Sequence, residues 1–97
     1  MKHSLIVPVY GNEETIPELL RQISALELET AGPFEAVFVV DGSPDNSYAL
    51  LKLRLPEVPF PSQLICLSRN FGAFAAVRAG LAHAKGEWMA TLAADLQ

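Results

Sequence analysis

Four short apolar segments constrain the fold of this 97-residue chain more than any other feature. Each has the length of a β-strand and is continuous in Val, Ile, Leu or Phe instead of alternating with polar residues. Continuous runs of this kind are typical of parallel strands that are covered on both faces. The segments are residues 4–9, 34–40, 63–68 and 88–93. They predict an α/β fold around a parallel sheet.

Helical patterns lie between these strands. Residues 15–28 repeat apolar side chains at helical spacing, with Pro17 in the first turn, where its missing N–H costs nothing. A second helix is expected from Ser47, as N-cap, to the residue before Pro56. Residues 55–62 contain three prolines and are expected to form a loop.

The third helical pattern, residues 72–84, is rich in alanine. Phe74, Val77 and Leu81 form one stripe, and we interpret this segment as a core helix in which Ala76 and Gly80 allow close approach to the sheet. Regular alternation of strand and helix predicts a single doubly wound domain over residues 1–97, with right-handed crossovers.

Composition excludes several classes of protein. With 51% hydrophobic and 19% charged residues the chain is not intrinsically disordered, and its net charge of −4 argues against nucleic acid as a partner. The single cysteine, Cys66, excludes an internal disulfide and is expected to be a small buried strand residue. No apolar run reaches the length of a membrane span, so a cytoplasmic location is expected for this chain.

Polar side chains follow every predicted strand, and each group has an ordinary explanation on its own. The Asp-Gly-Ser-Pro-Asp sequence from Asp41 is a turn, and Asn12 and Glu13 are able to cap a helix. Arg69 and Asp95 would be a surface cation and a turn residue.

Their convergence favours a ligand site, because the carboxyl ends of parallel strands form the ligand-binding edge of such sheets. Asp41 can accept hydrogen bonds from a base or a ribose hydroxyl, and Arg69 can contact phosphate. Asp95 and Gln97 can offer oxygen atoms to Mg²⁺ or Mn²⁺. This set of groups suits a nucleoside diphosphate with a divalent metal. Neither a Gly-x-Gly-x-x-Gly sequence after a strand nor a P-loop sequence is present.

Four motifs, in this order along the chain, closely resemble those of glycosyltransferase family 2. Within that family they are most similar to the dolichyl-phosphate mannose synthases and the bacterial polyprenyl-phosphate glycosyltransferases. They are Leu-Ile-Val-Pro-Val-Tyr-Gly-Asn-Glu-Glu (5–14), Val-Val-Asp-Gly-Ser-Pro-Asp (39–45), Ser-Arg-Asn-Phe-Gly (68–72) and Ala-Asp-Leu-Gln (94–97). The resemblance implies a Rossmann-like half of a GT-A domain with strand order 3-2-1-4. It also implies that Pro8, Tyr10, Asn12, Glu13 and Asp41 surround the nucleoside of a UDP- or GDP-sugar. Arg69 would lie near the phosphates, and Asp95 in an Asp-x-Asp metal motif.

The chain departs from this family in two motifs and in length. Ala93 stands where the metal motif usually begins with Asp, and Val40 stands where many members have a second acidic residue. Because the family's catalytic domain continues past the metal motif, we interpret residues 1–97 as the donor-binding, N-terminal part of a longer enzyme, inactive alone. The resemblance implies a polyprenyl phosphate acceptor and a parent associated with the cytoplasmic face of a membrane. The fragment is expected to self-associate through its fourth strand.

Two alternatives remain open. The first alternative to a glycosyltransferase is a nucleotide-sugar fold that lost metal chemistry at Ala93 and serves as a binding or scaffolding domain. The second is an unrelated flavodoxin-like domain whose strand ends match by chance.

Overall fold

The computed structural model describes residues 3–29 and 34–92. Every predicted strand and helix is present, with ends shifted by one or two residues. The elements are β1 (His3–Val9), α1 (Ile16–Glu29), β2 (Phe34–Asp41), α2 (Ser47–Arg54), the 3₁₀ turn η1 (Leu55–Glu57), β3 (Ser62–Leu67), α3 (Ala73–His83) and β4 (Trp88–Thr91). Ala93, the last residue of the predicted fourth strand, lies outside the described residues.

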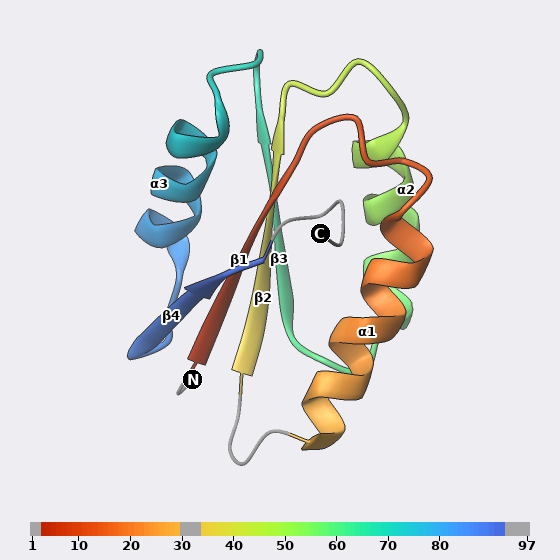
Figure 1. The fold of residues 1–97 in the computed structure, drawn as a ribbon, viewed down its shortest axis with the longest axis vertical. Coiled ribbons are helices and arrows are strands. Elements are labelled where there is room, and N and C mark those ends of the chain that lie inside the picture. Colours follow the sequence, from red (N-terminus) through yellow and green to blue (C-terminus); the bar gives the residue numbers. More distant parts are fainter. Residues whose placement is uncertain (1–2, 30–33, 93–97) are drawn as a thin grey trace.

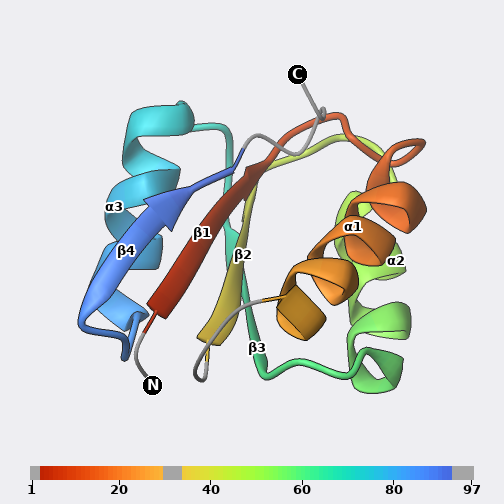
Figure 2. The same cartoon turned by 60° about the horizontal axis from the view of Figure 1, so that its bottom comes forward.

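The sheet has four parallel strands in the order β3-β2-β1-β4, as predicted. Helices α1 and α2 cover one face and α3 covers the other (Figures 1 and 2). The central strands β1 and β2 therefore lie between two helical layers, and the side chains of β2 are buried throughout. This arrangement explains why these two segments are continuously apolar.

The larger core lies between the sheet and helices α1 and α2. Its fully buried members come from alternate positions of β1 and β2 and from the inner face of α1. They are joined by Leu51 of α2, and Phe60 stacks on Phe34 with ring centroids 5.8 Å apart. The α1 face predicted from the sequence is correct at Ile16, Leu19, Leu20 and Ile23.

The smaller core, beneath α3, confirms the close approach expected at Ala76 and Gly80 but not a core position for Phe74. Ala76 and Gly80 face Ile6, Val37 and Val39, whereas Phe74 is 79% exposed. A Cβ atom on Gly80 would lie 2.6 Å from Cγ2 of Ile6. Since the branched side chains of the sheet already fill this layer, only small residues fit against them and the larger ones point outward.

Three further expectations were wrong in detail. Asn46, and not Ser47, is the N-cap of α2, and the segment expected to be a loop contains the η1 turn. Cys66 is an exposed thiol because β3 is an edge strand. Strand β4 forms the other edge of the described sheet and is exposed along its length.

A buried carboxylate fixes the connection between α3 and β4. Glu35 accepts hydrogen bonds from Ser4 Oγ (2.8 Å), Gln63 Nε2 (2.9 Å) and the backbone N–H of Lys85 (2.6 Å). Burial opposes ionisation of Glu35, but these donors outweigh it and lower the pKa of the carboxyl. Gly86 N donates in turn to Ser4 Oγ (2.8 Å), so β4 starts beside β1.

None of the helices in the described residues combines the length and the apolar character needed to cross a membrane.

Candidate functional site at the carboxyl edge of the sheet

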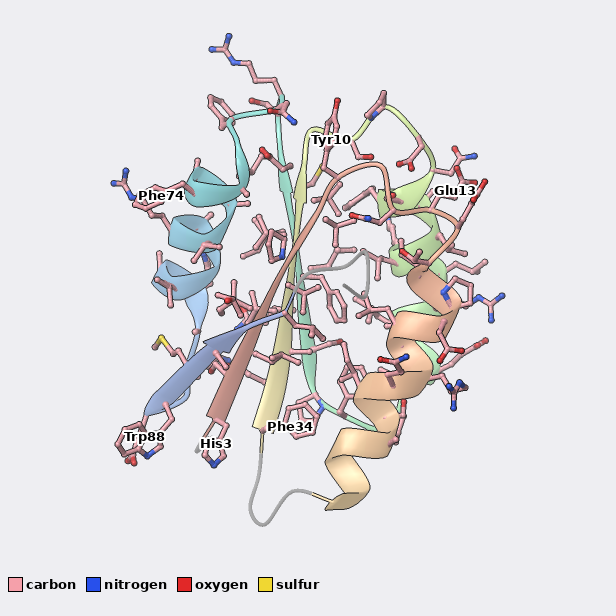
Figure 3. The ribbon with its side chains drawn as sticks, viewed as in Figure 1. His3, Tyr10, Glu13, Phe34, Phe74 and Trp88 are labelled. Atoms are coloured by element: carbon pink, nitrogen blue, oxygen red, sulfur yellow. The ribbon has the colours of Figure 1, made fainter. Side chains whose placement is uncertain are left out.

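Strand register brings the predicted site residues to one edge. Val9 lies beside Val40, and Asp41 lies beside Leu67, so the loops after β1, β2 and β3 leave the sheet in the same row. Figure 3 shows Tyr10 and Glu13 at this end and His3, Phe34 and Trp88 at the opposite end. Tyr10 is 50% exposed, with its ring free to meet a ligand from solvent.

The loops after β1 and β2 are tied together by hydrogen bonds. Gly11 N donates to Ser43 Oγ (2.9 Å), and Glu13 N donates to Asp45 Oδ2 (3.2 Å). Glu13 returns the contact, because its carboxylate accepts hydrogen bonds from the backbone N–H and side-chain amide of Asn46, both at 3.3 Å. Glu13 thus joins the two loops, a role that the sequence did not predict for it.

Asp45 is the acceptor at the centre of this junction. Besides the bond from Glu13 N, it accepts hydrogen bonds from Ser43 Oγ (2.5 Å) and Ser47 N (3.0 Å). Burial raises the pKa of this carboxyl, but the hydrogen bonds from Ser43, Ser47 and Glu13 prevail and lower the pKa to about 2. Asp45 is therefore ionised at neutral pH and fixes the start of α2.

Asp41 lies at the same edge but is turned inward. Its Oδ1 accepts the N–H of Phe71 (2.8 Å) and its Oδ2 accepts the N–H of Gly72 (2.9 Å), and only 3% of the residue is exposed. Both N–H groups belong to the loop that leads into α3, which begins at Ala73. Asp41 thus holds the loop before α3 from the end of β2, and both of its oxygens accept hydrogen bonds from protein.

The next residue brings the two loops into backbone contact. Gly42 has a φ of +61°, and a Cβ atom there would lie 2.1 Å from the carbonyl carbon of Arg69. Only glycine allows this approach, which is why the turn after β2 can support the loop after β3.

Arg69 and Phe71 form the exposed end of that loop. The guanidinium carbon of Arg69 lies 5.2 Å from the centre of the Phe71 ring, within the range of a cation–π contact. Both residues are exposed, and Arg69 has no acidic partner among the described residues. The pair offers a cation and a flat apolar surface to a ligand.

Asn12 and Pro8 have local roles. Asn12 Oδ1 accepts the N–H of Tyr10 (2.8 Å), and its carbonyl oxygen accepts the N–H groups of Thr15 (3.0 Å) and Ile16 (3.2 Å). The Asn12 side chain therefore shapes the turn that carries Tyr10. Pro8 is half-buried within β1, opposite Val39.

The predicted metal ligands Asp95 and Gln97 lie outside the described residues. Within residues 3–29 and 34–92, no group of three or more His, Cys, Asp or Glu side chains is arranged to hold a metal ion.

Ser43 and Phe71 were not predicted as parts of this site. A signal for Phe71 exists in its position two residues after Arg69 at a strand end. Ser43 carries no such signal, because its role depends on Gly11, 32 residues earlier in the chain.

A pocket of about 260 Å³ lies at the other end of the sheet, lined by His3, Ser4, Leu5, Phe34, Trp88, Met89 and Ala90. It contains no carboxylate or permanent cation and lies opposite the edge that gathers the polar groups. We therefore assign the candidate site to the carboxyl edge, where charge and hydrogen-bonding groups converge.

Comparison with known proteins shows which proteins this chain is similar to. The curated undecaprenyl-phosphate 4-deoxy-4-formamido-L-arabinose transferase of Pseudomonas fluorescens (strain Pf0-1) is 42% identical over 94 residues, 97% of this chain. That match covers 28% of the relative, so the chain spans little more than a quarter of its length.

Solved structures agree with the sequence match. The crystal structure of S. aureus TarS 1–349 in complex with UDP superposes with a TM-score of 0.81 at 28% identity, over 98% of this chain and 28% of the TarS 1–349 chain. The complex of the same protein with UDP-GlcNAc gives a TM-score of 0.82, over 98% and 27% of the two chains. The expected GT-A type of fold is thereby confirmed. The family model described as glycosyl transferase family 2 matches residues 4–97, and the chain therefore belongs to that family.

Proposed function

We propose that this chain is the donor-binding part of a glycosyltransferase that takes its sugar from a nucleoside diphosphate. The observation that carries the proposal is the exposed Arg69–Phe71 pair, held at the same edge as Tyr10 by Asp41 and Gly42. Relatives support it, because S. aureus TarS has been crystallised with UDP and with UDP-GlcNAc.

Each exposed group suits one part of such a donor. The ring of Tyr10 can stack on a base, and the guanidinium of Arg69 can bind the diphosphate through charge-assisted hydrogen bonds. Asp41 acts on this site through the loop that it holds by hydrogen bonds. We propose this in place of the direct nucleoside contact expected from sequence, because both Asp41 oxygens already accept backbone N–H groups.

For the acceptor, we propose a polyprenyl phosphate, since the curated relatives are named as undecaprenyl-phosphate sugar transferases. In such a transfer an acceptor phosphate oxygen forms the new bond to the sugar C1 as the bond from C1 to the nucleoside diphosphate breaks. The acceptor oxygen is already anionic near neutral pH, so positioning matters more than proton removal.

The donor-binding assignment rests on length as well as on the site. Because the chain matches 28% of its curated relatives, we infer that acceptor-binding groups belong to parts of the longer enzymes that it does not match. We also propose Mg²⁺ or Mn²⁺ as cofactor, with Asp95 and Gln97 offering oxygen ligands; the ion would neutralise charge on the leaving diphosphate.

Calorimetric titration of the chain with UDP tests the proposed donor site. Arg69→Ala should weaken UDP binding by about 10-fold or more, as expected for loss of a charge-assisted contact. Arg54→Ala removes an exposed arginine at the end of α2 and is the matched control. The same titration with GDP tests the base.

The rival function, a scaffolding domain without nucleotide binding, predicts a different result. In that case neither nucleotide gives measurable heat with the wild-type chain, with or without Mn²⁺. If the Arg69→Ala and Arg54→Ala variants bind UDP with equal affinity, the phosphate site does not lie at the loop after β3.

A further inference from the structure

The outer face of α3 carries apolar and cationic side chains in one stripe. Phe74, Arg78 and Leu81 follow one another at helical spacing and are all exposed. The exposed Phe71 precedes the helix and the exposed Lys85 follows it. We call these five residues the α3 outer face. In Figure 3 the labelled side chain of Phe74 projects from α3 away from the sheet.

This stripe is not part of the core. The side of α3 that contacts β1 and β2 is made of Ala76 and Gly80, and it is filled by the sheet side chains. Phe74, at 79% exposed, has the most exposed side chain among the large apolar residues described. An exposed aromatic cluster with a polar surround is typical of an interaction surface.

Charge separates the two halves of the chain. Residues 58–86 contain Arg69, Arg78 and Lys85 and no Asp or Glu, giving a formal charge of +3 in a chain whose net charge is −4. Acidic residues flank this segment directly on both sides, Glu57 before it and the exposed Glu87 after it. The α1 and α2 side carries three cations, Arg21, Lys52 and Arg54, but more carboxylates, Glu13, Glu14, Glu18, Asp45 and Glu57. An anionic partner is therefore attracted to α3 and repelled by the opposite layer.

We propose that the α3 outer face docks on the surface of an anionic lipid bilayer. Aromatic and leucine side chains between cations match the chemistry of such an interface, in which rings enter the headgroup region and Lys or Arg pair with lipid phosphates. Phe71 and Arg69 belong to the loop at the candidate site, so docking along α3 brings that edge of the sheet to the membrane level. The surface goes beyond nucleotide binding, and it fits the proposed lipid-linked acceptor.

Vesicle co-sedimentation tests this surface. The chain should bind vesicles made of equal parts phosphatidylcholine and phosphatidylglycerol, bind phosphatidylcholine alone much less, and be released by salt. Arg78→Glu and Phe74→Ser should each weaken binding by about 10-fold. Failure to bind the anionic vesicles would overturn the proposal.

The chain offers matched controls on the opposite layer. Lys52→Glu makes the same charge change on α2, and Leu53→Ser removes a side chain that is also exposed there, at 68%. Both should bind vesicles like the wild type. Equal losses in the α2 and α3 variants would mean that overall charge, and not this face, governs binding.

Two more measurements distinguish membrane docking from misfolding and from dimer formation. Circular dichroism and thermal unfolding establish that each variant is folded. One outcome would make this face an interface between two copies of the chain: Phe74→Ser converts a dimer to a monomer, and neither the wild type nor any variant binds anionic vesicles. The lipid assignment would then be wrong. UDP titration of Arg78→Glu should match the wild type, so failure of the donor site and failure of the membrane surface give different results.

Discussion

Gly42 and Arg69 meet backbone to backbone, so closely that a Cβ atom on Gly42 would lie 2.1 Å from the carbonyl carbon of Arg69. With the hydrogen bonds from Phe71 and Gly72 to Asp41, this contact makes the end of β2 and the loop before α3 one structural unit. The proposed phosphate contact at Arg69 therefore depends on residues that need not touch a ligand.

Gly42→Ala should separate these two loops. Gly11→Ala is the matched control, since Gly11 also has a positive φ (+66°) but a Cβ atom there would meet nothing within 4 Å. Both variants pay for the left-handed conformation, about 1 kcal/mol, and Gly42→Ala should lose a further 1 to 3 kcal/mol or so of unfolding free energy through the clash. Urea unfolding of both proteins measures the difference, and equal losses would show that the loops move apart at little cost.

Asp41→Asn tests whether Asp41 acts through Arg69. An amide cannot accept both N–H groups, so unfolding free energy should fall by about 1 to 3 kcal/mol. If Asp41 only positions the loop, Asp41→Asn should weaken UDP binding in the wild type and have no further effect in an Arg69→Ala background. Additive losses by calorimetry would instead support a direct nucleoside contact by Asp41.

The lowered pKa of Asp45 predicts a loss of stability in acid. A carboxyl whose folded pKa is about 2, below its ordinary value of 3.8, stabilises the fold above pH 4. That contribution disappears as the pH falls from about 4 to 2, and it should be on the order of 1 kcal/mol because water partly screens the junction. Asp45→Asn should be less stable than wild type at pH 6, and the two unfolding curves should converge near pH 2. A constant difference across this range would contradict the role given to Asp45.

The strands and helices were predictable because their signals are local. Continuous apolar runs and helical repeats are typical of parallel α/β chains and can be read from short segments. The strand order 3-2-1-4 was instead predicted from the family resemblance. The close approach of α3 at Ala76 and Gly80 was predicted correctly, but the exposure of Phe74 was not, because hydrophobicity alone favours a phenylalanine as a core residue. The decisive fact is the volume of Ile6 and Val39 on the sheet, which belongs to distant parts of the chain.

The position of Tyr10, Asp41 and Arg69 at one edge of the sheet was predictable, but their individual contacts were not. Residue order placed Tyr10, Asp41 and Arg69 at strand ends, and parallel register aligns those ends. Which carboxylate faces solvent and which caps a backbone depends on contacts across about 30 residues of sequence, as between Asp41 and Phe71. Neither the composition nor the spacing of residues along the chain predicts such contacts.

Ala93→Asp should strengthen metal binding if Asp95 and Gln97 are ligands, since it adds a carboxylate oxygen two residues before Asp95. We expect tighter Mn²⁺ binding in the presence of UDP, measured by calorimetry. Ala82→Asp, which adds the same charge at an exposed position of α3, is the control. If both variants bind Mn²⁺ as the wild type does, the metal site is built elsewhere.

The exposed edge of the sheet predicts self-association of this chain. Strand β4 pairs only with β1 among the described residues, so the backbone groups of its outer side are open to another strand. Trp88 is 64% exposed and lines the apolar pocket beside this edge. Pairing of two copies through β4 would satisfy those groups and bury both tryptophans, and burial stabilises the dimer by about 1.5 to 3 kcal/mol for each side chain.

Light scattering over a dilution series should therefore show a concentration-dependent dimer. Trp88→Ser should weaken this dimer, and Leu53→Ser on α2 should leave it unchanged. A wild-type chain that stays monomeric at high micromolar concentration would mean that β4 is stable as an open edge.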